Sequence, residues 1–251
     1  MLKYLWIIIK ELPLLIVKYF LFLKNNLFKK KISSEKRYQQ LHKIAIKFNK
    51  KINVEMIFTG LDKLPCKQSF VLTPNHQSLM DAVCLLAFME QKTSFIAKKE
   101  SKKFPIVGEA ISSIDCLYLD RENLRQEIEL MKKVKLSLKT ENKKWIIFPE
   151  GTRSKNKDFA LNEFKAGTFK MPMAVKSDIY PVAIWGSYRV LSPKIRMKKY
   201  PVYIHIFEPI SVDFYKDKST SELANYVENL IKSKVEELKI LDQENLKKYL
   251  K

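Results

Sequence analysis

From about residue 52 onward, short apolar runs of strand length alternate with longer stretches that have helical spacing. This alternation limits the possible folds strongly, because strands connected through helices usually form a parallel sheet with helices on its faces. The predicted strands are Ser69–Thr73, Ser94–Ala97, Ile114–Leu119, Trp145–Phe148, Tyr180–Trp185 and Val202–Phe207. The predicted helices are Leu79–Met89, Leu124–Lys139 and Glu222–Leu241, the last preceded by a Ser219-x-x-Glu222 capping box. We therefore expect an α/β fold with a mostly parallel, twisted sheet covered by helices.

The first 50 residues have a different character and are expected to form a helical membrane-associating region, residues 1–50, in front of an α/β domain, residues 51–251. Residues 1–23 are very apolar, and their few charged side chains fall within an arc of roughly 100° on a helical wheel. This pattern is typical of a helix that lies in a membrane interface, with a division at Pro13. A tilted spanning helix with snorkelling lysines remains the alternative.

The formal net charge of +20 implies an acidic partner, and its distribution favours anionic lipid. Residues 1–50 carry 12 Lys and Arg and 2 acidic residues, so half of the surplus lies in a fifth of the chain. A further helix is expected over 35–50, where His42 is interpreted as structural or exposed. No nucleic-acid-binding motif is present, and we expect no such partner. Cys66, Cys84 and Cys116 lack metal-ligand spacing and are interpreted as reduced thiols, which favours the cytoplasmic face of the cell membrane.

One histidine, His76, follows the first predicted strand directly, within the sequence Asn75-His76-Gln77-Ser78-Leu79-Met80-Asp81. An imidazole can accept a proton from a hydroxyl near neutral pH, and a carboxylate on its other nitrogen stabilises the imidazolium. If the chain turns at Gln77, Asp81 can return to His76 and serve this role. The alternative is that Ser78 caps a helix and Asp81 completes a capping box. The two roles are compatible.

A second polar stretch, Phe148-Pro149-Glu150-Gly151-Thr152-Arg153-Ser154, follows the strand predicted over Trp145–Phe148. Gly151 permits a positive φ or a close approach of backbone to a ligand. Arg153 offers a guanidinium suited to phosphate, and its neighbours offer hydroxyl groups. The stretch is either an anion-binding loop or an ordinary turn.

Both stretches resemble sequence blocks of the glycerophospholipid acyltransferases, the family that includes the 1-acylglycerol-3-phosphate O-acyltransferases. The first matches the Asn-His-x-x-x-x-Asp motif, and the second matches the Phe-Pro-Glu-Gly-Thr-Arg-Ser block without a gap. Tyr118-Leu119-Asp120-Arg121 resembles the block that ends in a phosphate-contacting arginine, although its usual glycine is missing. Lys98, with Lys99 as the fallback, resembles a second phosphate contact. Phe164–Gly167 and Tyr180–Val182 resemble later blocks, with Pro181 as an acyl-chain wall or a strand-edge residue.

The resemblance implies a glycerolipid acyltransferase fold and the transfer of an acyl group to the 2-hydroxyl of 1-acyl-sn-glycerol-3-phosphate, giving phosphatidic acid. It implies His76 as general base and Asp81 as its partner. The residues it implies for binding the acceptor are Lys98, Arg121, Glu150, Gly151, Thr152 and Arg153. We expect neither metal nor cofactor, no acyl-enzyme, and an acyl-CoA or acyl carrier protein thioester as co-substrate. The alternatives are another acceptor, such as glycerol-3-phosphate or another lysophospholipid, and an inactive basic membrane-binding protein.

Overall fold

The structure is a computed structural model, and it describes residues 16–65, 68–120, 124–141, 143–154 and 158–250. The strands are β1 (Val54–Thr59), β2 (Val71–Pro74), β3 (Thr93–Lys98), β4 (Leu117–Leu119), β5 (Lys144–Ile147), β6 (Ile179–Trp185) and β7 (Tyr200–Ile206). The helices are residues 16–27, α2 (Ser34–Lys51), α3 (Leu79–Phe88), α4 (Pro105–Ser113), α5 (Leu124–Thr140), α6 (Ala166–Val175), α7 (Val212–Tyr215) and α8 (Thr220–Asn245).

The described strands form a seven-stranded sheet in the order β1-β7-β6-β2-β5-β3-β4. Each neighbouring pair is parallel except β6 and β7, which run antiparallel. The predicted mostly parallel sheet is therefore confirmed. Because β2, β5 and β3 are parallel neighbours, their carboxyl ends meet at one edge of the sheet, which is where ligands gather in open α/β folds.

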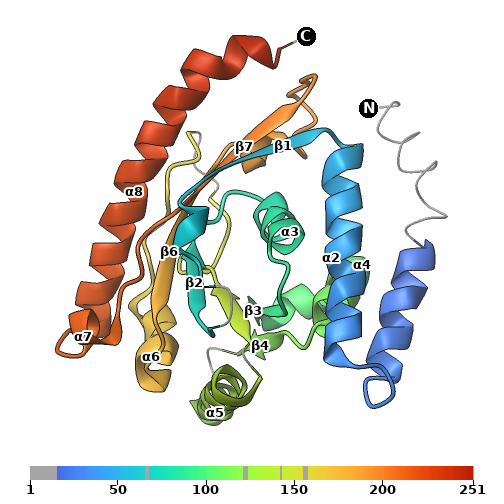
Figure 1. Ribbon diagram of the computed structural model, residues 1–251, viewed down its shortest axis with the longest axis vertical. Helices are drawn as coiled ribbons and strands as arrows, with labels where there is room; N and C mark the ends of the chain where they lie inside the picture. The colour runs from blue at the N-terminus through green and yellow to red at the C-terminus, as the bar shows by residue number, and fades with distance from the viewer. Residues whose placement is uncertain (1–15, 66–67, 121–123, 142, 155–157, 251) are drawn as a thin grey trace.

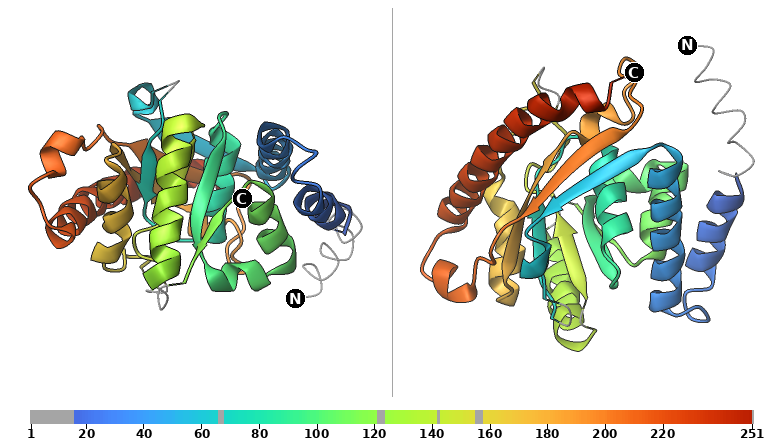
Figure 2. Two further views of the ribbon diagram at one scale, coloured as in Figure 1. Left: turned by 90° about the horizontal axis from the view of Figure 1, so that it is seen from below. Right: turned by 45° about the horizontal axis from the view of Figure 1, so that its top comes forward.

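Helices cover both faces of this sheet (Figures 1 and 2). Along β6, Tyr180, Val182 and Ile184 join one core with α2, α3 and α4, whereas Ile179, Ala183 and Trp185 join a second core with α6 and α8. The strand alternates in this way because successive side chains point to opposite faces. A third core lies between β5 and α5, and it contains Trp145 and Ile147.

Several elements differ from the sequence prediction. The predicted strand Ile114–Leu119 is shorter, since Ile114 caps α4 and Asp115 has a φ of +59°, so β4 begins only at Leu117. Strand β1 was not predicted, because its side chains are mostly half-buried and no buried run marks it. Helices α4 and α6 were also missed, since they contain Gly108, Gly167 and Pro172, which are poor helix formers.

The described part of the amino-terminal region packs against the α/β core. Phe22 is buried, and the Asn26 side chain donates a hydrogen bond to the backbone carbonyl of Glu109 in α4 at 3.0 Å. The predicted second helix is α2, which packs on α3 through the buried side chains of Tyr38 and Leu41. His42 is also buried, and its Nδ1 lies 2.7 Å from the carbonyl oxygen of Leu86, which confirms a structural role.

Candidate active site

The two polar stretches lie next to each other because the strands that carry them, β2 and β5, are parallel neighbours. The backbone N–H of His76 donates to the Glu150 carboxylate, and the backbone N–H of Ser154 donates to the carbonyl of His76 at 2.8 Å. The His76 ring stacks on Phe148 with 4.0 Å between ring centroids. The histidine and the loop at 148–154 are therefore parts of one site.

His76 and Asp81 form the predicted pair. Nδ1 of His76 lies 2.8 Å from Oδ2 of Asp81, whose side chain is fully buried. The same oxygen accepts from the backbone N–H groups of Gln77 at 2.7 Å and Ser78 at 2.8 Å. Ser78 is the N-cap of α3 and Asp81 completes the capping box. The capping role and the pairing with histidine therefore coexist, and the turn at Gln77 brings the carboxylate back to the ring.

Glu150 occupies a different place from the acceptor contact that we expected of it. Its side chain is buried, and its two oxygens accept from the backbone N–H groups of His76 and, at 2.8 Å, Asn162. Burial raises the pKa of Glu150 to about 7, although these hydrogen bonds act in the opposite direction. Its buried carboxyl group therefore links the loop at 148–154 to the backbone of His76.

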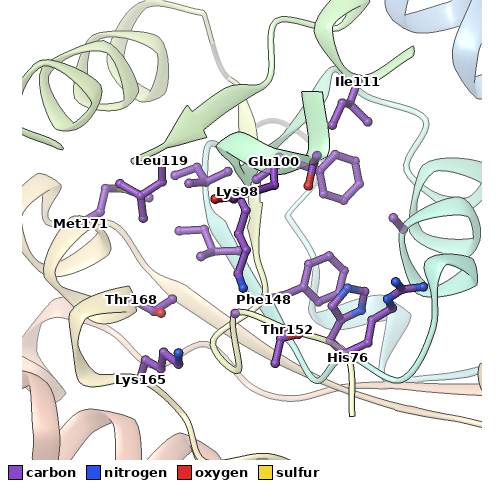
Figure 3. A pocket seen from close by; sticks show the side chains of 18 of the residues that line it. His76, Lys98, Glu100, Ile111, Leu119, Phe148, Thr152, Lys165, Thr168 and Met171 are labelled. Atoms are coloured by element: carbon purple, nitrogen blue, oxygen red, sulfur yellow. The ribbon is translucent and has the colours of Figure 1, made fainter. Parts of the chain in front are cut away.

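A cavity of about 530 Å³ opens beside His76 (Figure 3). Its walls are largely apolar and include Phe95, Val107, Ile111, Leu119, Leu130 and Met171. Polar and charged groups also line it, and they include Thr152, Thr168, Lys98, Arg153, Lys165, Lys170 and one acidic residue, Glu100. An apolar space with cations beside it suits an amphiphile that has a long chain and an anionic group.

The predicted binding residues fall into three groups. Lys98, Gly151, Thr152 and Arg153 line the cavity, and Gly151 has the expected positive φ of +66°. Figure 3 shows the Lys98 side chain extending into the cavity toward Thr152. Lys99, the fallback, forms an ion pair with Asp120 at 2.8 Å. Arg121 lies outside the described residues, so its contact with the acceptor stays a prediction.

Some features of the site did not follow from the sequence. Thr168 and Lys170 lie on α6, and the helix-breaking residues within α6 hid the pattern that would have placed them beside the cavity. Pro181, expected at a strand edge or as an acyl-chain wall, lies in β6 between β2 and β7 and does not line this cavity.

Of the three cysteines, Cys66 lies outside the described residues, and neither of the other two is an activated nucleophile. Cys84 and Cys116 are buried free thiols, and burial raises the pKa of both. Because the thiolate is the nucleophilic form, neither is suited to form an acyl-enzyme. No three His, Cys, Asp or Glu side chains of the described residues are grouped as a metal site would require.

The chain resembles known acyltransferases over more than half of its length. The family model for acyltransferases matches residues 55–185. A 1-acyl-sn-glycerol-3-phosphate acyltransferase of Saccharomyces cerevisiae is 26% identical over 68% of this chain and 57% of its own length. The enzyme of the same description from Helicobacter pylori is 33% identical over 48% of this chain and 50% of its own. The chain thus spans about half the length of these relatives.

A solved structure is also similar. The crystal structure of a 1-acyl-sn-glycerophosphate acyltransferase from Thermotoga maritima superimposes with a TM-score of 0.68 and 28% sequence identity. The match covers 92% of this chain and 97% of that one. The similarity therefore extends well beyond the residues matched by the family model.

Proposed function

This chain belongs to the acyltransferase family, and from this membership we propose that it moves a fatty acyl group from a thioester to the 2-hydroxyl of 1-acyl-sn-glycerol-3-phosphate. The product is phosphatidic acid, so the reaction belongs to phospholipid biosynthesis. The observation that carries the proposal is the His76–Asp81 pair beside an apolar cavity that also holds basic side chains. The names of the similar enzymes from yeast, Helicobacter pylori and Thermotoga maritima support this acceptor.

The chemistry assigned to His76 follows from its hydrogen bonds. Asp81 occupies Nδ1, which leaves Nε2 for the substrate. Nε2 takes the proton of the 2-hydroxyl while its oxygen attacks the thioester carbonyl. The new C–O bond forms, the C–S bond breaks, and the proton passes from His76 to the departing thiolate. General base catalysis of this kind is worth roughly 10²–10⁴ in rate.

The phosphate of the acceptor is assigned to the basic residues beside the histidine. Arg153 and Lys98 line the cavity, and Arg121 is proposed as a third contact on the strength of its sequence block. Thr152 and the backbone at Gly151 lie next to them on the same loop. The apolar walls would hold an acyl chain. The thioester is a co-substrate, acyl-CoA or acyl carrier protein, and we propose no bound metal or cofactor.

Arg153→Ala should raise the acceptor KM by about 10- to 100-fold, because a hydrogen bond to a charged group is worth roughly 1.5–3 kcal/mol. The donor KM should change little. The measurement is steady-state kinetics with each substrate varied in turn. Arg196→Ala is the matched control, since Arg196 is exposed and is not part of the cavity lining. An increase confined to the donor KM would reverse the assignment of the two substrates.

The function itself is tested by mass spectrometry of the lipids made by the purified protein. The acceptors offered are lysophosphatidic acid, glycerol-3-phosphate and lysophospholipids with larger head groups, each with coenzyme A and carrier-protein thioesters. We expect phosphatidic acid from the first acceptor. A different acylated product would select another acceptor. If no lipid is acylated and oligonucleotides bind tightly in low salt, the enzymatic proposal is wrong.

We also propose that the amino-terminal region, residues 1–50, associates with the membrane at its cytoplasmic face, where acceptor and product reside, while residues 51–251 form the catalytic domain. In the helix at residues 16–27, Phe22 packs inward while Val17 and Phe20 are exposed. Leu27 and Phe28 are also exposed, and the exposed Lys30 and Lys31 follow them in the chain. Within the described residues, no helix has the length and apolar character needed to cross a bilayer. An interfacial position fits this surface.

Replacing Phe20, Leu27 and Phe28 together with serine should weaken binding to anionic vesicles by about 10²-fold, since each side chain contributes roughly 1 kcal/mol when it enters the interface. Vesicle co-sedimentation measures the effect. The control is Ile240→Ser with Leu241→Ser, because these side chains are exposed on α8, across the sheet from the amino-terminal helix (Figure 1). An equal loss of vesicle binding in both variants would show that the surface with Phe20, Leu27 and Phe28 is not a specific membrane-binding site.

A further inference from the structure

The two oxygens of Asp81 have different partners. Oδ2 accepts the three hydrogen bonds described above, from Nδ1 of His76 and from two backbone N–H groups. Oδ1 faces the other way and accepts a hydrogen bond from the hydroxyl of Ser187, which is 106 residues further along the chain. Both Asp81 and Ser187 are completely buried. Among the described residues, Ser187 supplies the hydrogen-bond donor to the second oxygen of this carboxylate.

Ser187 lies on a turn whose position is fixed independently of Asp81. The turn is η3 (Ser187–Arg189), directly after β6. Gly186 before it has a φ of +92°, and a Cβ there would lie 2.6 Å from the carbonyl oxygen of Pro201. Arg189 is buried and donates to Asp242 of α8 through Nη1 at 2.9 Å. Trp185 Nε1 also donates to Asp242, at 3.0 Å.

The same end of β6 also holds the flanks of the histidine segment. The backbone N–H of Ile184 donates to the Asn75 side chain at 2.7 Å, and that side chain returns a hydrogen bond to the Ile184 carbonyl at 3.0 Å. The backbone N–H of Gly186 donates to the Gln77 side chain at 3.2 Å. The segment from Asn75 to Asp81 is thus bound along its length by β6 and the turn that follows it.

We propose that Ser187 is a positioning residue for the reaction: its hydroxyl holds the Asp81 carboxylate at the distance and angle that His76 requires. It acts through Asp81 and touches no substrate. The family model ends at residue 185, so Ser187 lies beyond the matched segment. The inference rests on the proposed acyl transfer only insofar as His76 and Asp81 are its catalytic pair.

The physical reason is the burial of the anion. A buried carboxylate needs donors on both oxygens, because solvent does not reach it. Without the Ser187 hydroxyl, the charge on Asp81 would be compensated only from the Oδ2 side, and the side chain could rotate away from the imidazole. A carboxylate that turns away no longer holds Nδ1 of His76, so the imidazole loses the orientation and the tautomer that proton transfer requires.

The test compares Ser187→Ala and Ser187→Thr with the unaltered protein. For Ser187→Ala, kcat should fall about tenfold or more, since hydrogen bonds to charged groups are worth roughly 1.5–3 kcal/mol. Both KM values should change less than about twofold, because no substrate contact is lost. The dependence of kcat on pH should also change, because the hydrogen bond between His76 and Asp81 is altered. Ser187→Thr keeps the hydroxyl and should recover most of the activity.

The matched control is Ser113→Ala. Ser113 is equally buried, and its hydroxyl donates to the Ala110 carbonyl at 2.6 Å in α4. This variant reports the loss of a buried hydroxyl elsewhere in the fold and should leave the pH profile unchanged. Equal shifts of the profile in Ser113→Ala and Ser187→Ala would overturn the proposal, as would a Ser187→Ala enzyme with unaltered kcat.

A second measurement does not depend on turnover. The chain has only three histidines, so NMR can follow the imidazole of His76 directly, with its signal identified by its loss in His76→Ala. The imidazole signals of His76, which report its hydrogen bond to Asp81, should shift in Ser187→Ala and stay in place in Ser113→Ala. Unchanged signals overturn the proposal even if the acceptor has been assigned wrongly. Shifted signals in a protein that acylates no lysophosphatidic acid support Ser187 and reject the proposed function. Glu150, the other carboxyl group beside His76, is the same in all these variants.

Discussion

His76→Ala should abolish acyl transfer to lysophosphatidic acid, with kcat lower by about 10²–10⁴, the range typical of general base catalysis. The reason is geometric: Nδ1 is held by Asp81, and the ring lies at the cavity, so no other imidazole of the described residues can replace it. The fold should survive, because the side chain lies at the cavity and the backbone hydrogen bonds of residue 76 with Glu150 and Ser154 remain in the variant. Product formation by mass spectrometry and circular dichroism measure the two effects.

His205→Ala provides the matched control. His205 lies on β7, is half-buried and pairs with the Thr59 hydroxyl at 2.7 Å. Removing it deletes an imidazole and a hydrogen bond without touching the cavity lining. Activity should stay within about twofold of the original. If His76→Ala retained comparable activity, the base would have to be another group and the mechanism would be wrong.

The sequence predicted those features of the site that depend on residues close together in the chain. Asn75–Asp81 and Phe148–Ser154 each come after a short buried strand, and parallel strands expose their carboxyl ends at one edge. The pairing of His76 with Asp81 could also be predicted, because the two residues are only five positions apart and the start of α3 lies between them. These features depend on neighbours in the chain.

Other features depend on residues that are far apart in the chain, and these could not be predicted from the sequence. The hydrogen bond from Ser187 to Asp81 exists only because β6 lies beside β2 in the sheet. The order of strands, the antiparallel β6–β7 pair and the enclosure of Glu150 have the same origin. Local propensity was misleading for α6, where packing against α8 stabilises a helix despite Gly167 and Pro172. Tertiary contacts outweigh propensities of this size.

Asp81→Asn should lower kcat by about 10³-fold while retaining most of the stability of the protein. Two backbone N–H groups and Nδ1 of His76 surround the position of Oδ2, so the amide oxygen of asparagine should occupy it. The amide nitrogen then faces the Ser187 hydroxyl, which can accept as well as donate. The tautomer of His76 is thereby preserved and only the negative charge is lost. Two unit charges about 4 Å apart attract by roughly 4 kcal/mol in a partly polar interior, which corresponds to the expected factor.

Asp81→Ala separates charge from geometry. It removes the charge and also leaves the backbone N–H groups of Gln77 and Ser78 without their acceptor. The free energy of unfolding should therefore fall by about 2 kcal/mol or more, in addition to the loss of kcat. Asp115→Asn is the control, because Asp115 is a half-buried carboxylate paired with Arg37 and Lys29, away from the cavity. It should lower stability without lowering kcat. An Asp81→Asn enzyme with nearly full activity would show that the charge is dispensable, and the carboxylate would then serve only as the cap of α3.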